Sequence, residues 1–513
     1  MAVRWGPGSL PSLASLAMVA GLVSGCGPTV SPGSIVPQAI RDRNLAPPGT
    51  NLLIDGDAEM GDATLTGYDS VTIPAWLESG LPTVVAYGVR GFPNARTPGA
   101  GNGKNFFTGG PFGSSTLTQA LDLTSAFAAI DGGGVTWKLS GLLGGKKTSK
   151  DHARVTATFR NAAGSALGAV TIGPVTNLQR GNATKFLLRT ASAKVPRHTR
   201  SVVVTLAFTQ YEAFYEGATL DNGYADDLAF SLSTPVAMPT LPPPPVSKVP
   251  KYDHVFFVYF ENSNFDQIVG NVKKAPYINA IAKQYSLLGN YYALHHPSDA
   301  NYVLQAAGGT YGLHQNNFQQ QPLAATHLAD LVERAHGTWK QYMESADGPC
   351  DMHRHGSYYP DDGPYMFFDD VRYDKARCEA HVVPWSQWAT DLNSTATTPE
   401  YAWLSPDDCD DMEGCGTTAG DNFLKNDIMK PLLVSPAWQH QKTLLIVAWD
   451  EDDFTPINHI PGIFVASDGV KSGFRSEVLY THYSILKTIE LALNLPELTR
   501  NDAYATFVND VWK

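Results

Sequence analysis

The stretch HVFFVYF at residues 254–260 is apolar after its first residue and runs directly into Glu261 and Asn262. A continuous apolar run of this length, bounded by polar turn residues, is typical of a strand that is buried on both faces of a parallel sheet. In open α/β sheets, ligand sites form at the carboxyl ends of such strands. The stretch therefore predicts an α/β sheet that delivers a carboxylate and an amide to its ligand-binding edge.

A second apolar run, TLLIVAW at residues 443–449, ends in the same way at Asp450 and Glu451. Strands that alternate with helices indicate a doubly wound α/β domain, which we place over residues 251–513. Both acidic pairs then lie at one edge of its sheet. The helical patterns that alternate with the strands cover residues 277–285, 324–334 and 481–493.

A serine lies between these two runs in sequence, in the segment HPSDANY at residues 296–302. The ordinary role of Ser298 is to cap the helix that follows. A hydroxyl at a helix N-terminus also lies where main-chain N–H groups favour a phosphate, and a nearby cation makes it a nucleophile. Oxygen ligands suit calcium, magnesium or manganese better than zinc. The candidate ligands of such a cation are Glu261, Asn262, Asp450 and Glu451.

The formal net charge of the chain is −12. An acidic protein gains no counterion release on nucleic acid, so nucleic acid is excluded as a partner. A small phosphate ester still binds where a local cation or a helix N-terminus overrides the global charge.

A proline-rich segment at residues 234–250 divides the chain, because such a run stays extended and joins neither sheet nor helix. Before it, residues 50–233 show short alternating segments separated by Gly-rich and Asn-rich turns. Regular short strands with turn residues between them predict an all-β sandwich.

The opening NLLIDGDAE at residues 51–59 and the closing DNGYADDL at residues 221–228 resemble galactose-binding-like jelly rolls, which accompany many secreted enzymes. The resemblance implies that Glu59 and either Asp226 or Asp227 share a structural calcium. Ordinary turn chemistry by Asp and Asn is the alternative. A glycan would bind this domain through aromatic side chains that otherwise belong to the core, namely Tyr211, Phe214 and Tyr215.

The N-terminus is a targeting segment over residues 1–26, with a basic Arg4 and an apolar stretch at residues 13–23. The stretch is too short and too rich in Gly and Ser for a spanning helix. Val-Ser-Gly-Cys, ending at Cys26, resembles a bacterial lipobox; an ordinary cleaved signal peptide is the alternative. Residues 27–49 then form a flexible tether. We expect an extracytoplasmic protein, secreted or held at the membrane by a lipid anchor only.

Four cysteines remain besides Cys26, and an even number in an exported protein indicates disulfides. Three pairings are open, of which the most local joins neighbouring cysteines. Zinc ligation is the rival, but no CxxC spacing supports it. The four residues are Cys350, Cys378, Cys409 and Cys415.

Six segments of the C-terminal half resemble, in order, the motifs of the bacterial phosphoesterase family, which contains secreted acid phosphatases and phospholipases C and is similar in fold to the alkaline-phosphatase superfamily. The resemblance implies that Ser298 is the nucleophile of a phosphoseryl intermediate beside a divalent metal. It also implies that His459 or His482 protonates the leaving group or binds a second metal, a structural hydrogen bond being the alternative for each. The segments are residues 261–270, 296–302, 339–344, 420–424, 449–451 and 480–490.

The sequence departs from the family pattern at three places. Ala300 stands where the family has proline, and Asp361 and Asp362 stand where it has Lys-His. Asp411 and Glu413 lie in a segment that resembles the family's Asp-Met-His, with Glu413 in place of the histidine, so both become candidate metal ligands. Because the lysine and histidine of the family pattern are missing, the site attracts phosphate less strongly. Histidines near the altered segment that would compensate are His353 and His355.

These observations favour a secreted, metal-dependent phosphomonoesterase of the acid phosphatase type. One alternative is a phosphodiesterase of the phospholipase C type, which would release diglyceride from lecithin. The other is a surface lipoprotein with a decayed active site that binds glycans through its β-domain and releases phosphate from no ester.

Overall fold

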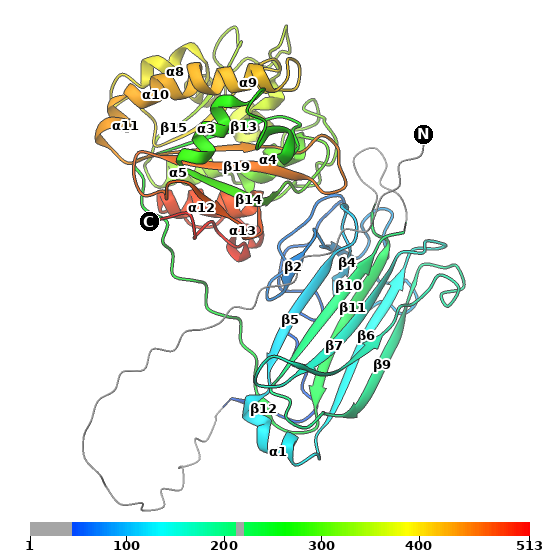
Figure 1. Ribbon diagram of the computed structural model, residues 1–513. Coiled ribbons are helices and arrows are strands. Elements are labelled where there is room, and N and C mark those ends of the chain that lie inside the picture. The colour runs from blue at the N-terminus through cyan, green and yellow to red at the C-terminus, as the bar shows by residue number, and fades with distance from the viewer. Residues whose placement is uncertain (1–43, 212–219) are drawn as a thin grey trace, which may run out of the picture. The chain divides into compact units, whose positions relative to one another are not determined.

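The computed structural model describes residues 44–211 and 220–513 (Figure 1). The predicted targeting segment with Cys26 and most of the predicted tether lie outside these residues, as do Phe214 and Tyr215. Within the described residues, no helix is both long enough and apolar enough to span a bilayer.

The N-terminal part consists of two five-stranded antiparallel sheets, with strand orders β2-β5-β10-β7-β8 and β3-β4-β11-β6-β9. Burial alternates along β10, whose Val202, Val204 and Leu206 share one core with Phe230 of β11. This alternation is why the segment forms a two-layer sandwich. The strands are β2 (Leu77–Ser79), β3 (Thr83–Ala86), β4 (Asn105–Thr108), β5 (Thr116–Asp122), β6 (Thr136–Gly145), β7 (His152–Arg160), β8 (Ala166–Ile172), β9 (Lys185–Lys194), β10 (Ser201–Thr209) and β11 (Gly223–Leu232), with η1 (Thr124–Ala126) and α1 (Phe127–Asp131) between β5 and β6.

A short strand pair shifts both boundaries of this part from their expected places. β1 (Leu45–Ala46) falls in the predicted tether and β12 (Val236–Ala237) in the predicted linker, and the two strands pair antiparallel. The pair joins segments that are distant in sequence, which is why no local pattern indicates it.

The C-terminal part is built on a nine-stranded sheet of order β16-β15-β17-β13-β18-β19-β14-β20, with β21 paired to β14. Its strands are parallel except for β19, which runs antiparallel to both of its neighbours. The expected doubly wound sheet is therefore mixed. The strands are β13 (His254–Phe260), β14 (Ser286–Tyr292), β15 (Trp339–Met343), β16 (Val382–Pro384), β17 (Tyr401–Ser405), β18 (Thr443–Trp449), β19 (His459–Ala466), β20 (Phe474–Ser476) and β21 (Tyr480–Thr481).

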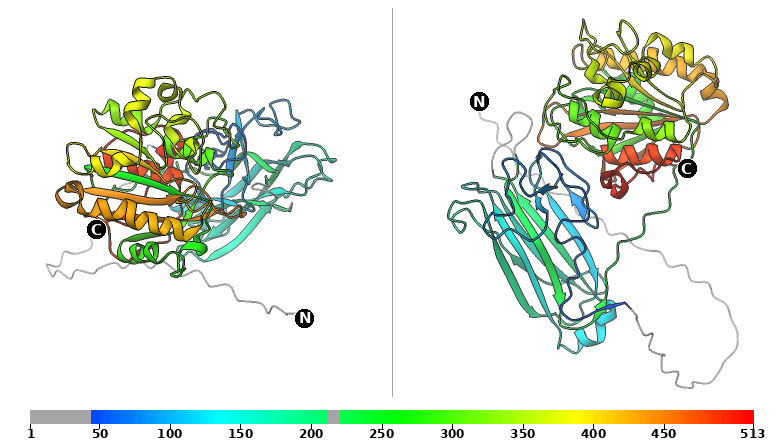
Figure 2. Two further views of the ribbon diagram at one scale, coloured as in Figure 1. Left: turned by 90° about the horizontal axis from the view of Figure 1, so that it is seen from above. Right: turned by 180° about the vertical axis from the view of Figure 1, so that it is seen from behind.

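Helices cover both faces of this sheet, with α12 and α13 on one face and α8 to α11 on the other (Figure 2, right). Every residue of β13 and of β18 is consequently buried, as their continuous apolar sequences predict. The helical segments are α2 (Phe265–Ile268), α3 (Pro276–Gln284), α4 (Asp299–Ala307), α5 (Leu328–Arg334), η2 (Pro360–Asp362), η3 (Pro364–Phe367), α6 (Asp369–Arg372), α7 (Lys375–His381), α8 (Ser386–Asp391), α9 (Thr417–Phe423), the π-helical η4 (Leu424–Met429), α10 (Lys430–Val434), α11 (Pro436–His440), α12 (His482–Leu493) and α13 (Arg500–Tyr504).

Candidate active site

The register of β13 and β18 brings the two acidic pairs together. The strands are parallel neighbours in which Phe260 lies opposite Trp449, so the residues that follow them leave the sheet side by side. The main-chain N–H of Asn262 donates to Asp450 Oδ1 at 3.3 Å. Glu261 is 3% exposed and Asp450 is fully buried, so both carboxylates lie away from bulk water.

Ser298 lies between the two strand ends. Its Oγ donates to Glu261 Oε2 at 3.3 Å and to Glu451 Oε1 at 3.1 Å. Helix α4 begins at the next residue, so the serine is held at a helix N-terminus. One hydroxyl therefore contacts carboxylates from two different strands, which is the convergence that a serine nucleophile beside a cation requires.

The pKa values of the carboxylates in this group are raised. Burial and the neighbouring charge of Asp450 raise the pKa of Glu261 well above its ordinary value. Burial and the charge of Glu451 do the same to the pKa of Asp450. Among the described residues, two buried acceptors of the group, Asp450 Oδ2 and Asn262 Oδ1, have no hydrogen-bond partner. Orphaned acceptors and repelling carboxylates fit a hard divalent cation, which satisfies both.

Three tighter groups of ligand-type side chains occur elsewhere in the described part of the chain, each with its ligand atoms within 4.8 Å of one another. The group at the ends of β13 and β18, namely Glu261, Asn262, Asp450 and Glu451, is called the strand-end group below. It is wider than these three groups, and Ser298 lies within it. In one of the three groups, Arg377 already neutralises two carboxylates. The groups are His327, Asp330 and Asp370; Asp347, Asp351 and His355; and Glu344, Asp407 and Asp410.

Two residues that flank Ser298 hold the carboxylates in place, and our sequence analysis assigned neither a role. His296 Nδ1 lies 2.7 Å from Glu451 Oε2, and the Tyr302 hydroxyl donates to Glu261. Burial opposes a charge on His296, but the charges of Glu451 and Asp452 outweigh it and raise its pKa to about 9. The sequence feature that could have pointed to His296 and Tyr302 is that both lie in the same seven-residue segment as the serine.

Asp411 and the acidic replacements Asp362 and Glu413 also lie near this group. The Asp411 carbonyl accepts the Glu261 N–H at 2.8 Å, and its carboxylate accepts the Glu413 N–H at 2.8 Å. Asp411 is 2% exposed, whereas Glu413 is exposed. The charges of Asp411, Asp362 and Glu413 all raise the pKa of Glu261, after burial and Asp450. The structure thus extends the strand-end group into a larger set of acids.

His482 contacts the site through the main chain. Its Nε2 lies 2.8 Å from the Asp450 carbonyl, and its Nδ1 accepts from the hydroxyls of Tyr259 and Tyr291 at 2.9 and 2.6 Å. Burial lowers its pKa to about 3, which agrees with a neutral ring that donates to the carbonyl. These contacts are the structural hydrogen bonds of the alternative interpretation, and they orient Asp450.

His459 lies in an aromatic stack. Its ring is 4.4 Å from that of Phe265 and 5.0 Å from that of Tyr292, between centroids. Its Nε2 is 3.2 Å from the Gly289 carbonyl, so the hydrogen bond that the ring makes is not with Ser298. The structure brings together the carboxylates, Asn262 and the serine, and leaves this histidine apart from them.

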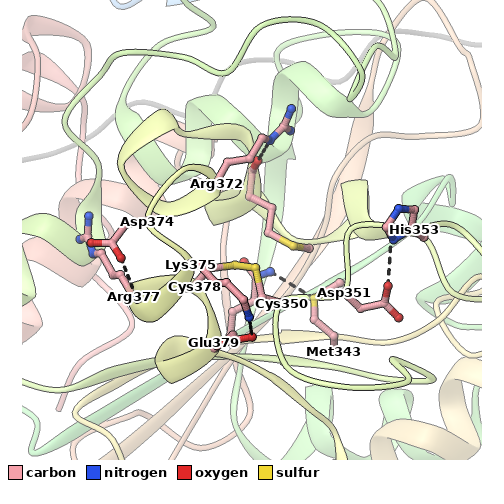
Figure 3. Close-up of a disulfide and its surroundings, with 12 residues drawn as sticks. Met343, Cys350, Asp351, His353, Arg372, Asp374, Lys375, Arg377, Cys378 and Glu379 are labelled. Atoms are coloured by element: carbon pink, nitrogen blue, oxygen red, sulfur yellow. Dashed lines mark hydrogen bonds and ion pairs between the residues drawn. A yellow bond between two sulfur atoms is a disulfide. The ribbon is translucent and has the colours of Figure 1, made fainter.

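Two disulfides join segments that carry acidic residues of the site, and one of them ends in α7 at Cys378. Cys350 is joined to Cys378 (Figure 3), and Cys409 is joined to Cys415. The structure thus has the most local of the three open pairings. Both bridges constrain segments that carry acidic residues of the site.

Residues 271–496 match the sequence profile described as the Phosphoesterase family. This part of the chain belongs to the phosphoesterase family. The match includes the serine and the second acidic pair, and the N-terminal sandwich lies outside it.

Curated relatives match about half of this chain. The phosphate-repressible acid phosphatase of Penicillium chrysogenum is 27% identical over 53% of this chain and 66% of its own length. The phosphatidylinositol-3-phosphatase of Mycobacterium tuberculosis is 29% identical over 52% of this chain and 85% of its own length. An acid phosphatase of Aspergillus fumigatus is 26% identical over 52% of this chain and 61% of its own length. This chain thus aligns with less than two thirds of the length of each of these fungal relatives.

Solved structures also resemble parts of the chain. A protein in the alkaline phosphatase superfamily from Vibrio parahaemolyticus has a TM-score of 0.39 and 11% identity over 51% of this chain and 72% of its own. The CBM22-1 xylan-binding domain of Paenibacillus barcinonensis Xyn10C has a TM-score of 0.21 and 15% identity over 34% of this chain and 98% of its own. Both scores are below 0.5, and we draw no conclusion from them.

Proposed function

We propose that the phosphoesterase part of this chain hydrolyses phosphomonoesters, with Ser298 as nucleophile and a divalent cation held by Glu261, Asn262, Asp450 and Glu451. The observation that supports this most is the position of Ser298 Oγ between carboxylates of two strands, beside orphaned buried acceptors. Hydrolysis of p-nitrophenyl phosphate at acid pH with added divalent metals is the direct test.

The cation would supply Lewis-acid stabilisation of the charge that develops on the serine oxygen and the phosphoryl group. Glu451 Oε1, at 3.1 Å, is the nearest acceptor for the Ser298 proton. The serine oxygen then bonds to phosphorus as the bond from phosphorus to the leaving oxygen breaks, and that oxygen takes up the proton released by Ser298 and leaves as the alcohol. Water attacks the resulting phosphoserine, the serine oxygen recovers a proton, and inorganic phosphate leaves.

His296 and Tyr302 act through the carboxylates. His296 fixes the Glu451 oxygen that does not face the serine, and Tyr302 fixes Glu261. We propose that His482 likewise fixes the Asp450 main chain. Held in this way, the carboxylates keep the geometry that in-line displacement needs without reorganisation.

A phosphoinositide is the second candidate substrate. It is favoured by the similarity to the mycobacterial phosphatidylinositol-3-phosphatase, which is matched over 85% of its length. Release of inorganic phosphate from phosphatidylinositol 3-phosphate would support this substrate. Release of diglyceride from lecithin would instead indicate a phospholipase C-type phosphodiesterase, and glycan binding without phosphate release from any ester would indicate a decayed site.

The pH dependence of stability tests the cation site. Burial, followed by the charge of Asp361, raises the pKa of Asp299 from its ordinary value of 3.8 to about 7. A raised pKa means that the folded state binds this proton more tightly than the unfolded chain, so the stabilisation is complete below pH 3.8 and is lost as pH rises through about 7. The pKa values of Glu261 and Asp450 are raised as well. We expect the metal-free protein to lose melting temperature over this range.

Added manganese or calcium should replace these protons and raise the melting temperature more at neutral than at acid pH. Thermal denaturation over a pH series, with chelator and with cation, measures both effects. A melting temperature that climbs with pH in chelator would contradict the prediction.

Three further expectations concern the location of the protein and the ligands of the sandwich. The two disulfides favour an oxidising compartment, so we propose an extracytoplasmic location. In the sandwich, the charges of Asp227 and Glu59 contribute, after burial, to raising the pKa of Asp226 to about 7, which supports the proposed calcium site there. The side chain of Tyr211 is 62% exposed, which suits the proposed glycan contact.

A further inference from the structure

The site has an excess of negative charge that a phosphate ester must approach. Asp361 and Asp362 in η2 and Glu413 in the loop between β17 and α9 add acids around the strand-end group. The positively charged side chain inside the group is that of His296, and it is already paired with Glu451. A dianionic substrate that enters here needs a cationic contact at the mouth of the site in addition to the metal.

Arg354 is a free guanidinium close to these acids. Its Cζ lies 3.4 Å from the centroid of the Tyr359 ring, so the group is held over an aromatic face. The side chain is exposed and forms no hydrogen bond or ion pair with any residue of the described ranges 44–211 and 220–513. Its five N–H donors are therefore available to a ligand.

The loop that carries Arg354 is fixed at several points. Cys350 at its start is bonded to Cys378 (Figure 3), and the Tyr358 hydroxyl donates to the Asp351 carbonyl at 2.6 Å. His355 Nε2 lies 2.8 Å from Asp351 Oδ2. A loop held in this way presents its arginine at one place and limits the entropy lost on binding.

The same loop is joined to the segment that reaches the catalytic group. The Asp408 N–H donates to the Ser357 carbonyl at 3.0 Å, and three residues later the Asp411 carbonyl accepts the N–H of Glu261. The charge of Arg354 lowers the pKa of Asp361 and of Glu413, although burial raises both overall. The guanidinium thus acts electrostatically on two of these acids, and its loop is hydrogen-bonded to the segment that carries Asp411 and Glu413.

We propose that Arg354 is a substrate-binding residue that holds the phosphate group of the ester at the mouth of the site. This inference rests on the proposed phosphomonoesterase function. A planar guanidinium offers two parallel N–H donors to a phosphate, which a lysine does not. Tyr359 holds the guanidinium over its ring, and the bridge between Cys350 and Cys378 fixes the loop.

The test compares R354A with R354K and with R334A. Arg334 is an exposed arginine in α5 of the same domain, so its replacement controls for lost charge alone. R354A is expected to raise both the KM for p-nitrophenyl phosphate and the inhibition constant of inorganic phosphate by about tenfold, with kcat within about threefold. R354K should fall between R354A and the wild type, and R334A should match the wild type.

The outcomes separate the binding role from the reaction itself. An active enzyme in which R354A leaves both constants unchanged would overturn the role of Arg354 and leave the proposed function intact. If the wild-type protein hydrolyses no ester, the role of Arg354 is tested by calorimetry, which measures the binding of inorganic phosphate to the manganese-loaded protein. Tighter phosphate binding by the wild type than by R354A would support the role, and equal binding would overturn it.

Discussion

Replacement of Ser298 with alanine is expected to reduce the turnover of p-nitrophenyl phosphate by roughly 10³-fold or more, since loss of a nucleophile removes the covalent route. The hydroxyl is the group that contacts both Glu261 and Glu451, so no neighbouring side chain takes its place. Steady-state kinetics with added manganese measures the loss. Mass spectrometry of acid-quenched wild-type enzyme should show one phosphoryl group on the peptide that contains Ser298.

The matched control is S263A. Ser263 is also buried close to the site, and its hydroxyl donates to the Glu261 carbonyl at 3.2 Å. Because the hydroxyl of this serine bonds to the main chain and, among the described residues, to no side chain, its loss should leave turnover within several-fold of wild type. Activity that survives in S298A at the level of S263A would refute the serine mechanism.

Replacement of Asp450 with asparagine is expected to abolish activity and to stabilise the metal-free protein. The side chain is fully buried and keeps its shape on substitution, so the change removes one repelling charge among the carboxylates. The cation loses a charged ligand at the same time, and turnover should fall by roughly 10²-fold or more. Calorimetry with and without manganese should show a higher melting temperature in chelator and little gain on adding the cation.

D453N provides the comparison for this prediction. Asp453 lies three residues further along the same loop and is exposed to solvent. Its substitution changes the net charge equally but leaves the cation site intact, so its melting temperature, cation response and kinetics should follow the wild type. A D450N protein that still gains stability from manganese as the wild type does would show that Asp450 is no ligand.

Much of the phosphoesterase fold follows from local sequence. The apolar runs at residues 254–260 and 443–449 form β13 and β18, and the helical spacing of residues 481–493 matches α12. The antiparallel direction of β19 does not follow, because its residues are as apolar as those of a parallel strand. The pairing of β1 with β12 is equally hidden, since a two-residue ladder depends on partners that are remote in sequence.

The candidate site, too, is only partly predictable from the sequence. That Glu261 and Asp450 meet follows from two strands ending at one edge of a sheet, which sequence patterns alone indicate. Other contacts depend on how side chains pack once the loops are placed, and no residue spacing encodes them. Examples are the stack of His459 between two aromatic rings and the contact of Arg354 with Tyr359.

The centre of the nine-stranded sheet pairs β13, which opens the domain, with β18 near its end, so that His254 lies opposite Thr443. During synthesis, Glu261 leaves the ribosome long before Asp450 exists, whereas every strand of the sandwich sheets has by then emerged. Domains near the N-terminus fold first, and remote parallel pairings close slowly. We expect the sandwich of the nascent chain to be folded while the C-terminal domain is still unfolded and depends on chaperones. A chain that stops short of Asp450 should aggregate instead of surviving as a weak enzyme.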